Sequence, residues 1–173
     1  ERAQDCYVWD LDGRRYVDFA NHHTTTILGH SHPAVLEAVQ KEIDRGLAFG
    51  MPTTLEAEMA EEITGRFPSI DRVRFTNSGT ESTLHVTRLV RAVTGKPKVA
   101  KFEGAYHGSH DALEISVFPP VNKAGPADAP NAVAGGEGMA EGSEENVVVL
   151  PYSQPESVEL ILREHKDEVA AVF

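Results

Sequence analysis

The spacing of apolar residues along the chain predicts amphipathic helices. Pro33 opens the first, and Thr53 opens the second, with Glu56 at the spacing of a capping box. Within each helix apolar positions recur three or four residues apart, as expected where one face is buried. The predicted helices cover residues 33–46, 53–65, 82–93 and 154–165.

Short apolar runs between these helices predict the strands. Residues 7–9 and 16–19 flank Asp12-Gly13, a dipeptide typical of hairpin turns. Further strands are predicted at 73–77, 99–102, 147–150 and 169–173. Because strands alternate with helices and several strands are apolar on both faces, we predict an α/β fold with a mainly parallel sheet flanked by helices.

Residues 119–146 interrupt this pattern. They are rich in Pro, Gly and Ala and carry clustered glutamates, so we expect a surface excursion that buries little. An interdomain linker is the alternative, but strands resume directly afterwards. The expected organisation is an N-terminal hairpin and helix segment at 1–50, followed by part of a larger domain at 51–173. Because the last residues have the pattern of an apolar core strand, we expect the chain to be truncated at its C-terminus.

Composition and charge narrow the possible functions. The chain has 173 residues, of which 40% are apolar and 25% charged, as in ordinary globular proteins. The formal net charge of −11 disfavours nucleic acids and anionic membranes as partners. Cys6 is the only cysteine, which excludes an internal disulfide and suits a cytoplasmic location.

The segment Asn-Ser-Gly-Thr-Glu-Ser at 77–82 joins a predicted strand to a predicted helix. A helix N-terminus presents free N–H groups at the positive end of its dipole, where a phosphate binds well. Ser78 and Thr80 add hydroxyl donors, and Gly79 permits close approach. An ordinary capped turn explains the segment about equally well. It lacks the endings of Walker and dinucleotide loops, which favours a small phosphorylated ligand over a nucleotide.

A second loop, Gly104 to Gly108, follows the strand predicted at 99–102. Its glycines bracket Tyr106 and His107, so a flat ligand can come close while Tyr106 stacks on it. Taken alone, a tight turn with a buried tyrosine is the better explanation. However, ligands of open α/β sheets bind beyond the carboxyl ends of strands, where these loops can converge. Together the loops favour an aromatic, phosphorylated cofactor.

The sequence resembles the class III aminotransferases, in particular their branch similar to glutamate-1-semialdehyde 2,1-aminomutase. The resemblance is carried by Asn-Ser-Gly-Thr-Glu at 77–81 and Phe-Glu-Gly-Ala-Tyr-His-Gly at 102–108, and segments at 10–13, 28–33 and 72–76 agree in order and spacing. It implies that residues 51–173 are part of the large domain of a fold-type-I enzyme, which binds pyridoxal 5′-phosphate (PLP). It also implies a homodimer with active sites at the subunit interface.

The resemblance further implies roles for individual residues. Asn21, Thr24 and Glu103 would lie on the substrate side. The aminomutase-like members have Ser-Trp where this chain has His22-His23, a departure that favours transamination over isomerisation. The residues implied to bind the cofactor are Ser78, Gly79, Thr80, Tyr106, His107 and Gly108.

No catalytic residue is expected within this chain, because the resemblance places the Schiff-base lysine beyond Phe173. The leading hypothesis is part of an aminotransferase that moves an amino group from an amino acid to an oxo acid. One alternative is an aminomutase that moves the amino group within one substrate. The other is a truncated, non-catalytic domain that binds cofactor or a partner.

The histidines raise the separate possibility of a metal site. His30-x-His32 and His107-x-x-His110 supply imidazoles at spacings that metal sites use. The turn before Pro33 explains the first pair better, and the cofactor loop explains His107 better. We therefore expect no metal.

Overall fold

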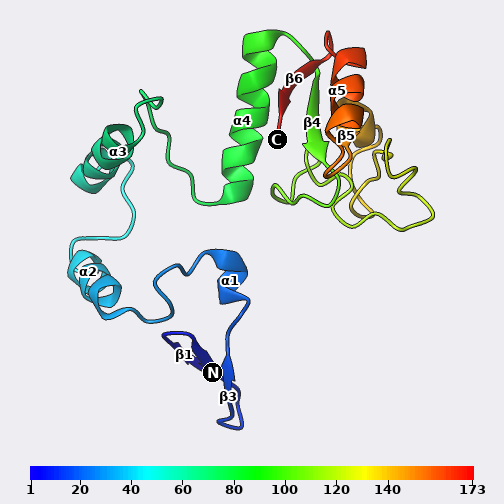
Figure 1. Ribbon diagram of the computed structural model, residues 1–173. Helices are drawn as coiled ribbons and strands as arrows, with labels where there is room; N and C mark the ends of the chain where they lie inside the picture. The colour runs from blue at the N-terminus through cyan, green and yellow to red at the C-terminus, as the bar shows by residue number, and fades with distance from the viewer. The chain divides into compact units, whose positions relative to one another are not determined.

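The computed structural model describes residues 1–173, which form two compact units, Glu1–Arg72 and Val73–Phe173. Each unit is described by itself, and Figure 1 shows the elements of both. The boundary between the two units follows Arg72, and the organisation into 1–50 and 51–173 stays a prediction. None of the helices is long and apolar enough to cross a membrane.

The first unit begins with an antiparallel sheet. Its strands pair in the order β1-β2-β3. The predicted hairpin around Asp12-Gly13 is confirmed, and Gly13 adopts the positive φ of 77° that the turn requires. The first strand was not predicted. The strands are β1 (Arg2–Gln4), β2 (Tyr7–Trp9) and β3 (Arg15–Val17).

Helices α1 (Asn21–Thr24), α2 (Pro33–Ile43) and α3 (Thr54–Arg66) complete this unit. The capping box of α3 is confirmed, because Thr53 Oγ1 accepts the N–H of Glu56 and the Glu56 carboxylate accepts the N–H of Thr53. The predicted end of α3 at Gly65 is wrong by one residue. The helix tolerates that glycine and ends at Arg66, whose side chain pairs with Glu62 one turn earlier.

The second unit contains the predicted parallel sheet. Strands β4 (Lys98–Phe102), β5 (Val147–Leu150) and β6 (Val169–Val172) are all parallel, in the order β5-β4-β6. Helices α4 (Gly79–Thr94) and α5 (Pro155–Glu164) and the short 3₁₀ helix η1 (Ser143–Asn146) surround it. The α/β fold class is confirmed.

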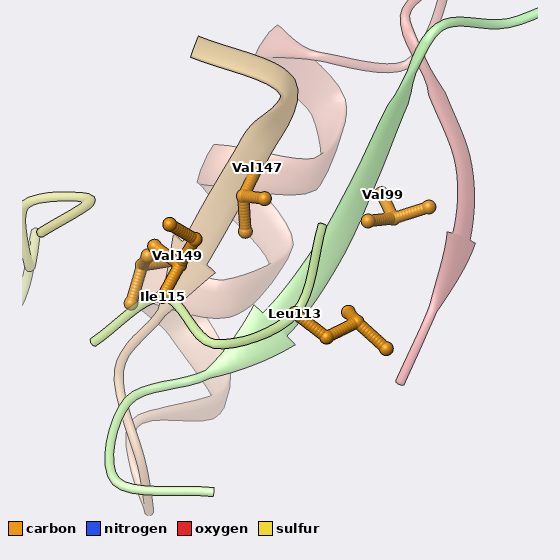
Figure 2. Close-up of a cluster of buried hydrophobic side chains, with 5 residues drawn as sticks. All are labelled: Val99, Leu113, Ile115, Val147 and Val149. Carbon is orange, nitrogen blue, oxygen red and sulfur yellow. The ribbon is translucent and has the colours of Figure 1, made fainter. Parts of the chain in front are cut away.

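The hydrophobic core lies on both faces of this sheet, because successive strand residues point to opposite sides. On one face Val99 of β4 packs with Leu113 and Ile115, which lie on the segment that crosses the sheet (Figure 2). Val90 of α4 packs against this cluster. On the other face Ala100, Val148 and Leu150 pack against α5. The sheet is therefore enclosed between α4 and α5.

The strand predicted at 73–77 is wrong, because the segment pairs with no other strand. An apolar run becomes a strand only where a neighbour accepts its backbone hydrogen bonds. The excursion at 119–146 returns to the core through Ser116, whose N–H donates to Val133 O and whose hydroxyl donates to Asn131 O. Ala132 and Met139 pack against the core, so the excursion is mostly exposed but anchored.

Candidate functional site

The N-terminus of α4 contains the first candidate residues. Ser78 is the N-cap, and its Oγ accepts the N–H of Glu81 at 3.1 Å. The helix therefore begins at Gly79 rather than at Ser82 as predicted. The N–H groups of Gly79 and Thr80 lie in the first turn, at the positive end of the dipole, where no intrahelical acceptor exists. This end of the helix suits an anion.

The loop that follows β4 contains the remaining candidates. The N–H of Glu103 donates to Leu150 O at 2.9 Å, which continues the ladder between β4 and β5. The N–H of Gly104 then donates to Ser116 O at 2.8 Å, and the positive φ of Gly104, 76°, turns the chain away from the sheet. The start of the loop is thus fixed to the buried sheet.

Gly108 brings the loop onto α4. A Cβ at Gly108 would lie 2.8 Å from both Cα and Oγ1 of Thr80, and its φ is 100°. The neighbouring Ser109 N–H donates to Thr80 Oγ1 at 3.2 Å. Only glycine permits this approach without strain. The two loops therefore converge.

Tyr106 projects from the middle of this loop. Its side chain is exposed, at 60% of its full accessibility, so the alternative of a tight turn around a buried tyrosine is wrong. The Tyr106 hydroxyl lies 3.0 Å from Ser109 Oγ, which holds one end of the ring. An exposed aromatic ring beside a helix N-terminus suits a flat ligand that carries an anion.

Polar groups are buried beneath the loop. The side chain of Lys101 is fully buried, and its Nζ donates to Ile115 O. Burial lowers the pKa of Lys101 to about 8, and the nearby Glu103 opposes that shift. Burial, together with Lys101, also lowers the pKa of His107. The sequence analysis missed Lys101, although a lysine within the apolar run Val-Ala-Lys-Phe was a visible signal.

Two buried atoms at this site have no hydrogen-bond partner within the protein, namely His107 Nε2 and Glu103 Oε1. Unpartnered buried polar atoms are costly and often mark a site for a ligand. Together with the helix N-terminus and the exposed ring of Tyr106, they fit an aromatic ligand that carries phosphate and further polar groups.

Asn21 and Thr24 lie in the other unit, in the single turn α1. All four residues of this turn have positive φ, from 45° at Asn21 to 68° at Thr24, a conformation that costs energy in non-glycine residues. Asp18 stabilises the turn, because its Oδ1 accepts the N–H groups of Ala20 and Asn21 at 2.9 Å. Its Oδ2 lies 2.6 Å from His30 Nε2, a hydrogen bond that lowers the pKa of Asp18.

The histidines form no cluster of the kind that binds a metal. No group of three or more His, Cys, Asp or Glu side chains converges in the structure. His30 contacts Asp18, and His110 contacts Thr83. His32 is the N-cap residue of α2, but its side chain makes no capping hydrogen bond.

The fold and this site define an α/β protein with a candidate site for a phosphorylated, aromatic ligand. The chain belongs to the aminotransferase class-III family, whose model matches residues 1–173.

Several relatives agree with this membership. The chain is 37% identical over 173 residues to glutamate-1-semialdehyde 2,1-aminomutase of Methanocaldococcus jannaschii, covering 100% of this chain and 39% of the relative. An omega-transaminase from Sphaerobacter thermophilus matches with 41% identity and a TM-score of 0.90, over 99% of this chain and 39% of the other. A transaminase with PLP bound matches with 38% identity and a TM-score of 0.86, over 99% and 39%. The chain therefore spans about 39% of the length of these relatives.

Proposed function

We propose that the chain is part of a PLP-dependent aminotransferase that moves an amino group from an amino acid to an oxo acid. The observation that carries this proposal is the contact of Gly108 with Thr80, which joins the loop after β4 (residues 103–110, here called the tyrosine loop) to the N-terminus of α4. Family membership and the similarity to a transaminase with PLP bound support it.

In this proposal each residue binds or orients the cofactor. The N–H groups of Gly79 and Thr80, with the hydroxyl of Ser78, hold the phosphate. Tyr106 stacks on the ring. When bound, PLP supplies an electron sink for amino-group transfer, which the side chains of this segment alone do not provide.

The polar groups beneath the loop complete this binding site. We assign His107 and Gly108 to the cofactor loop. We assign Glu103, whose Oε1 is buried without a hydrogen-bond partner, to the substrate side, and we assign Asn21 and Thr24 the same role. We assign no catalytic residue within this chain, which spans about 39% of the length of its relatives, and we propose the activity for the full-length protein.

An aminomutase is the second candidate, because the M. jannaschii relative has that name. The two reactions differ in their need for an acceptor. If the full-length protein is a transaminase, it should convert an amino acid only after an oxo acid is added. Conversion without any added acceptor would instead establish the aminomutase, and no conversion under either condition would leave a non-catalytic domain.

Replacement of Tyr106 tests cofactor binding directly. In the full-length apoprotein, Tyr106→Ala should weaken PLP binding roughly 2- to 12-fold, the range that corresponds to an aromatic stacking contact. Tyr106→Phe is the matched control, since it keeps the ring and loses only the contact with Ser109. Titration followed by absorbance gives the affinities. Equal affinities for Tyr106→Ala and the unchanged protein would contradict the stacking role.

We also propose that the full-length protein is a cytoplasmic homodimer. Apolar side chains on α2 remain about half exposed, among them Leu36 at 46% and Val39 at 50%, and a second copy is able to cover them. The free thiol of Cys6 is compatible with a reducing compartment. The molar mass in solution, measured by light scattering, tests the dimer, and a monomeric mass would refute it.

A further inference from the structure

Thr83 connects α4 to the tyrosine loop at a point that the sequence analysis did not identify. It lies one turn after Thr80 on α4. Its Oγ1 is 2.6 Å from the carbonyl oxygen of His107 and 3.2 Å from Nε2 of His110. Both partners belong to the loop that follows β4. One hydroxyl on the helix therefore contacts the loop twice.

The number of protons determines the direction of each hydrogen bond. A threonine hydroxyl has a single proton to donate, and a carbonyl oxygen can only accept. Thr83 Oγ1 also lies 3.1 Å from the carbonyl oxygens of Gly79 and Thr80 in α4, but the shortest contact is the one to His107 O, so the proton of Thr83 is directed there. The contact to His110 then requires its ring to donate from Nε2. The geometry thus assigns a proton to Nε2 of His110.

The surroundings of His110 favour the neutral ring. Burial is the main cause that lowers the pKa of His110, and the nearby Arg91 lowers it further. Asp111 and Glu114 oppose that shift. The other ring nitrogen, Nδ1, is buried without a hydrogen-bond partner, as are Nε and Nη2 of Arg91. A neutral ring with its proton on Nε2 satisfies the contact to Thr83 and adds no charge beside Arg91.

We propose, on the basis of the proposed function, that Thr83 and His110 are positioning residues that fix the tyrosine loop above the N-terminus of α4. His107 O, Ser109 N and His110 Nε2 each bond to a threonine of α4, so the backbone on the C-terminal side of Tyr106 is fixed at successive points. These bonds set the position of the Tyr106 ring relative to the phosphate site. A ligand that joins a phosphate to an aromatic ring needs both parts at a fixed separation, whereas inorganic phosphate does not.

The test compares Thr83 variants of the full-length apoprotein. Thr83→Val keeps the shape and removes the hydroxyl, and Thr83→Ser keeps the hydroxyl as the matched control. Thr83→Val should weaken PLP binding roughly 2- to 12-fold, the range for one hydrogen bond, while the affinity for inorganic phosphate stays unchanged. Thr83→Ser should bind PLP as the unchanged protein does. If Thr83→Val binds PLP normally, the positioning role is refuted.

Two further measurements do not depend on PLP. In the apoprotein, Thr83→Val should speed hydrogen exchange of the amides at 104–109 while the amides of α4 keep their protection. Nitrogen NMR of His110 should show the proton on Nε2. His110→Gln retains a donor near the same position and should preserve loop protection, whereas His110→Leu should lose it. A proton on Nδ1, or equal exchange in both His110 variants, would overturn the inference.

These outcomes also separate this inference from the proposed function. If the unchanged full-length protein fails to bind PLP, the proposed function fails, although the exchange and NMR results can still support the contact of Thr83 with His110. If the unchanged protein binds PLP and Thr83→Val does so equally well, the proposed function stands and only the positioning role is lost.

Discussion

The two units differ in what holds them together. In unit 1, Glu1–Arg72, no residue is fully buried, and its helices are stabilised by local features such as the capping box at Thr53. In unit 2, Val73–Phe173, a parallel sheet buries residues on both faces, and Leu113 and Ile115 are completely inaccessible. Local interactions define the elements of the first unit, while long-range packing defines the second.

This difference bears on the candidate site. The tyrosine loop begins at β4 and contacts α4, so its position follows from the buried sheet. Asn21 and Thr24 depend instead on hydrogen bonds from Asp18 within their own unit. The residues proposed to bind the cofactor are therefore positioned by packing within unit 2. The residues proposed for the substrate side are held only by local polar contacts.

The largest expected effect comes from truncating a core side chain of unit 2. Leu113→Ala in the full-length protein should lower stability by about 2–5 kcal/mol, because a cavity forms where Leu113 is now 0% exposed. Leu55→Ala on α3 is the matched control in unit 1, and at 48% exposure it should cost about 1 kcal/mol or less. Denaturant unfolding, combined with hydrogen exchange of each unit, measures both losses.

An equal loss at both positions would break the comparison. It would mean that another surface covers α3 in the full-length protein, since Leu55 can contribute as much as a core residue only when it is buried. A small loss at Leu113 would show that the sheet of unit 2 is not the main core.

Replacing glycines in the tyrosine loop should lower stability less, and it tests whether packing of this loop on α4 shapes the candidate site. Gly104 and Gly108 both have positive φ, so alanine adds backbone strain of about 1–3 kcal/mol at either position. Only at Gly108 does the new Cβ also meet a neighbour, Thr80, at 2.8 Å. At Gly104 nothing lies within 4 Å.

Gly108→Ala should therefore weaken PLP binding and lower the unfolding midpoint more than Gly104→Ala does. The matched pair separates the contact from the strain, because both variants carry the strain and only one carries the contact. Similar losses of PLP affinity in the two variants would show that the approach of Gly108 to Thr80 does not shape the site.

Structural features that depend on residues close together in the sequence were predictable. The spacing of Thr53 and Glu56 predicted the capping box, and Asp12-Gly13 predicted the hairpin turn. The strand predicted at 73–77 failed because local apolarity does not reveal whether a partner strand exists. The same reasoning explains most of unit 2, where the apolar runs identified β4, β5 and β6 but not the order in which they pair.

In the candidate site, too, local motifs were predictable and long-range contacts were not. Its loops were recognisable as short motifs, and Gly108 was identified within one of them. The contact between Thr83 and His110 was not, because it joins positions 27 residues apart, and the sequence provides no measure of that distance. Lys101 was visible as a lysine within an apolar run, but only the folded sheet shows that its side chain is fully buried.

The smallest expected effect is a difference in the response of the two units to acid. Burial lowers the pKa of His107 and of His110 from the ordinary value of 6.5, so the unfolded state binds protons more readily. Stability from these neutral rings is complete above about pH 6.5 and falls as the pH drops through their lowered pKa values. In unit 1, the hydrogen bond from His30 lowers the pKa of Asp18 from 3.8, so its contribution is lost only below that pH.

Acidification from pH 7 to pH 5 should therefore reduce amide protection in unit 2 and leave the protection near Asp18 unchanged. Hydrogen exchange, corrected for the intrinsic rate at each pH, measures both. His110→Gln should reduce the loss in unit 2, because the amide does not titrate and, of the two rings with a lowered pKa, only His107 remains. If acid instead loosens Asn21–Thr24 first, polar contacts in unit 1 are more sensitive to protonation than the buried rings. The contrast between a locally held unit and a packed unit would then fail at Asn21–Thr24.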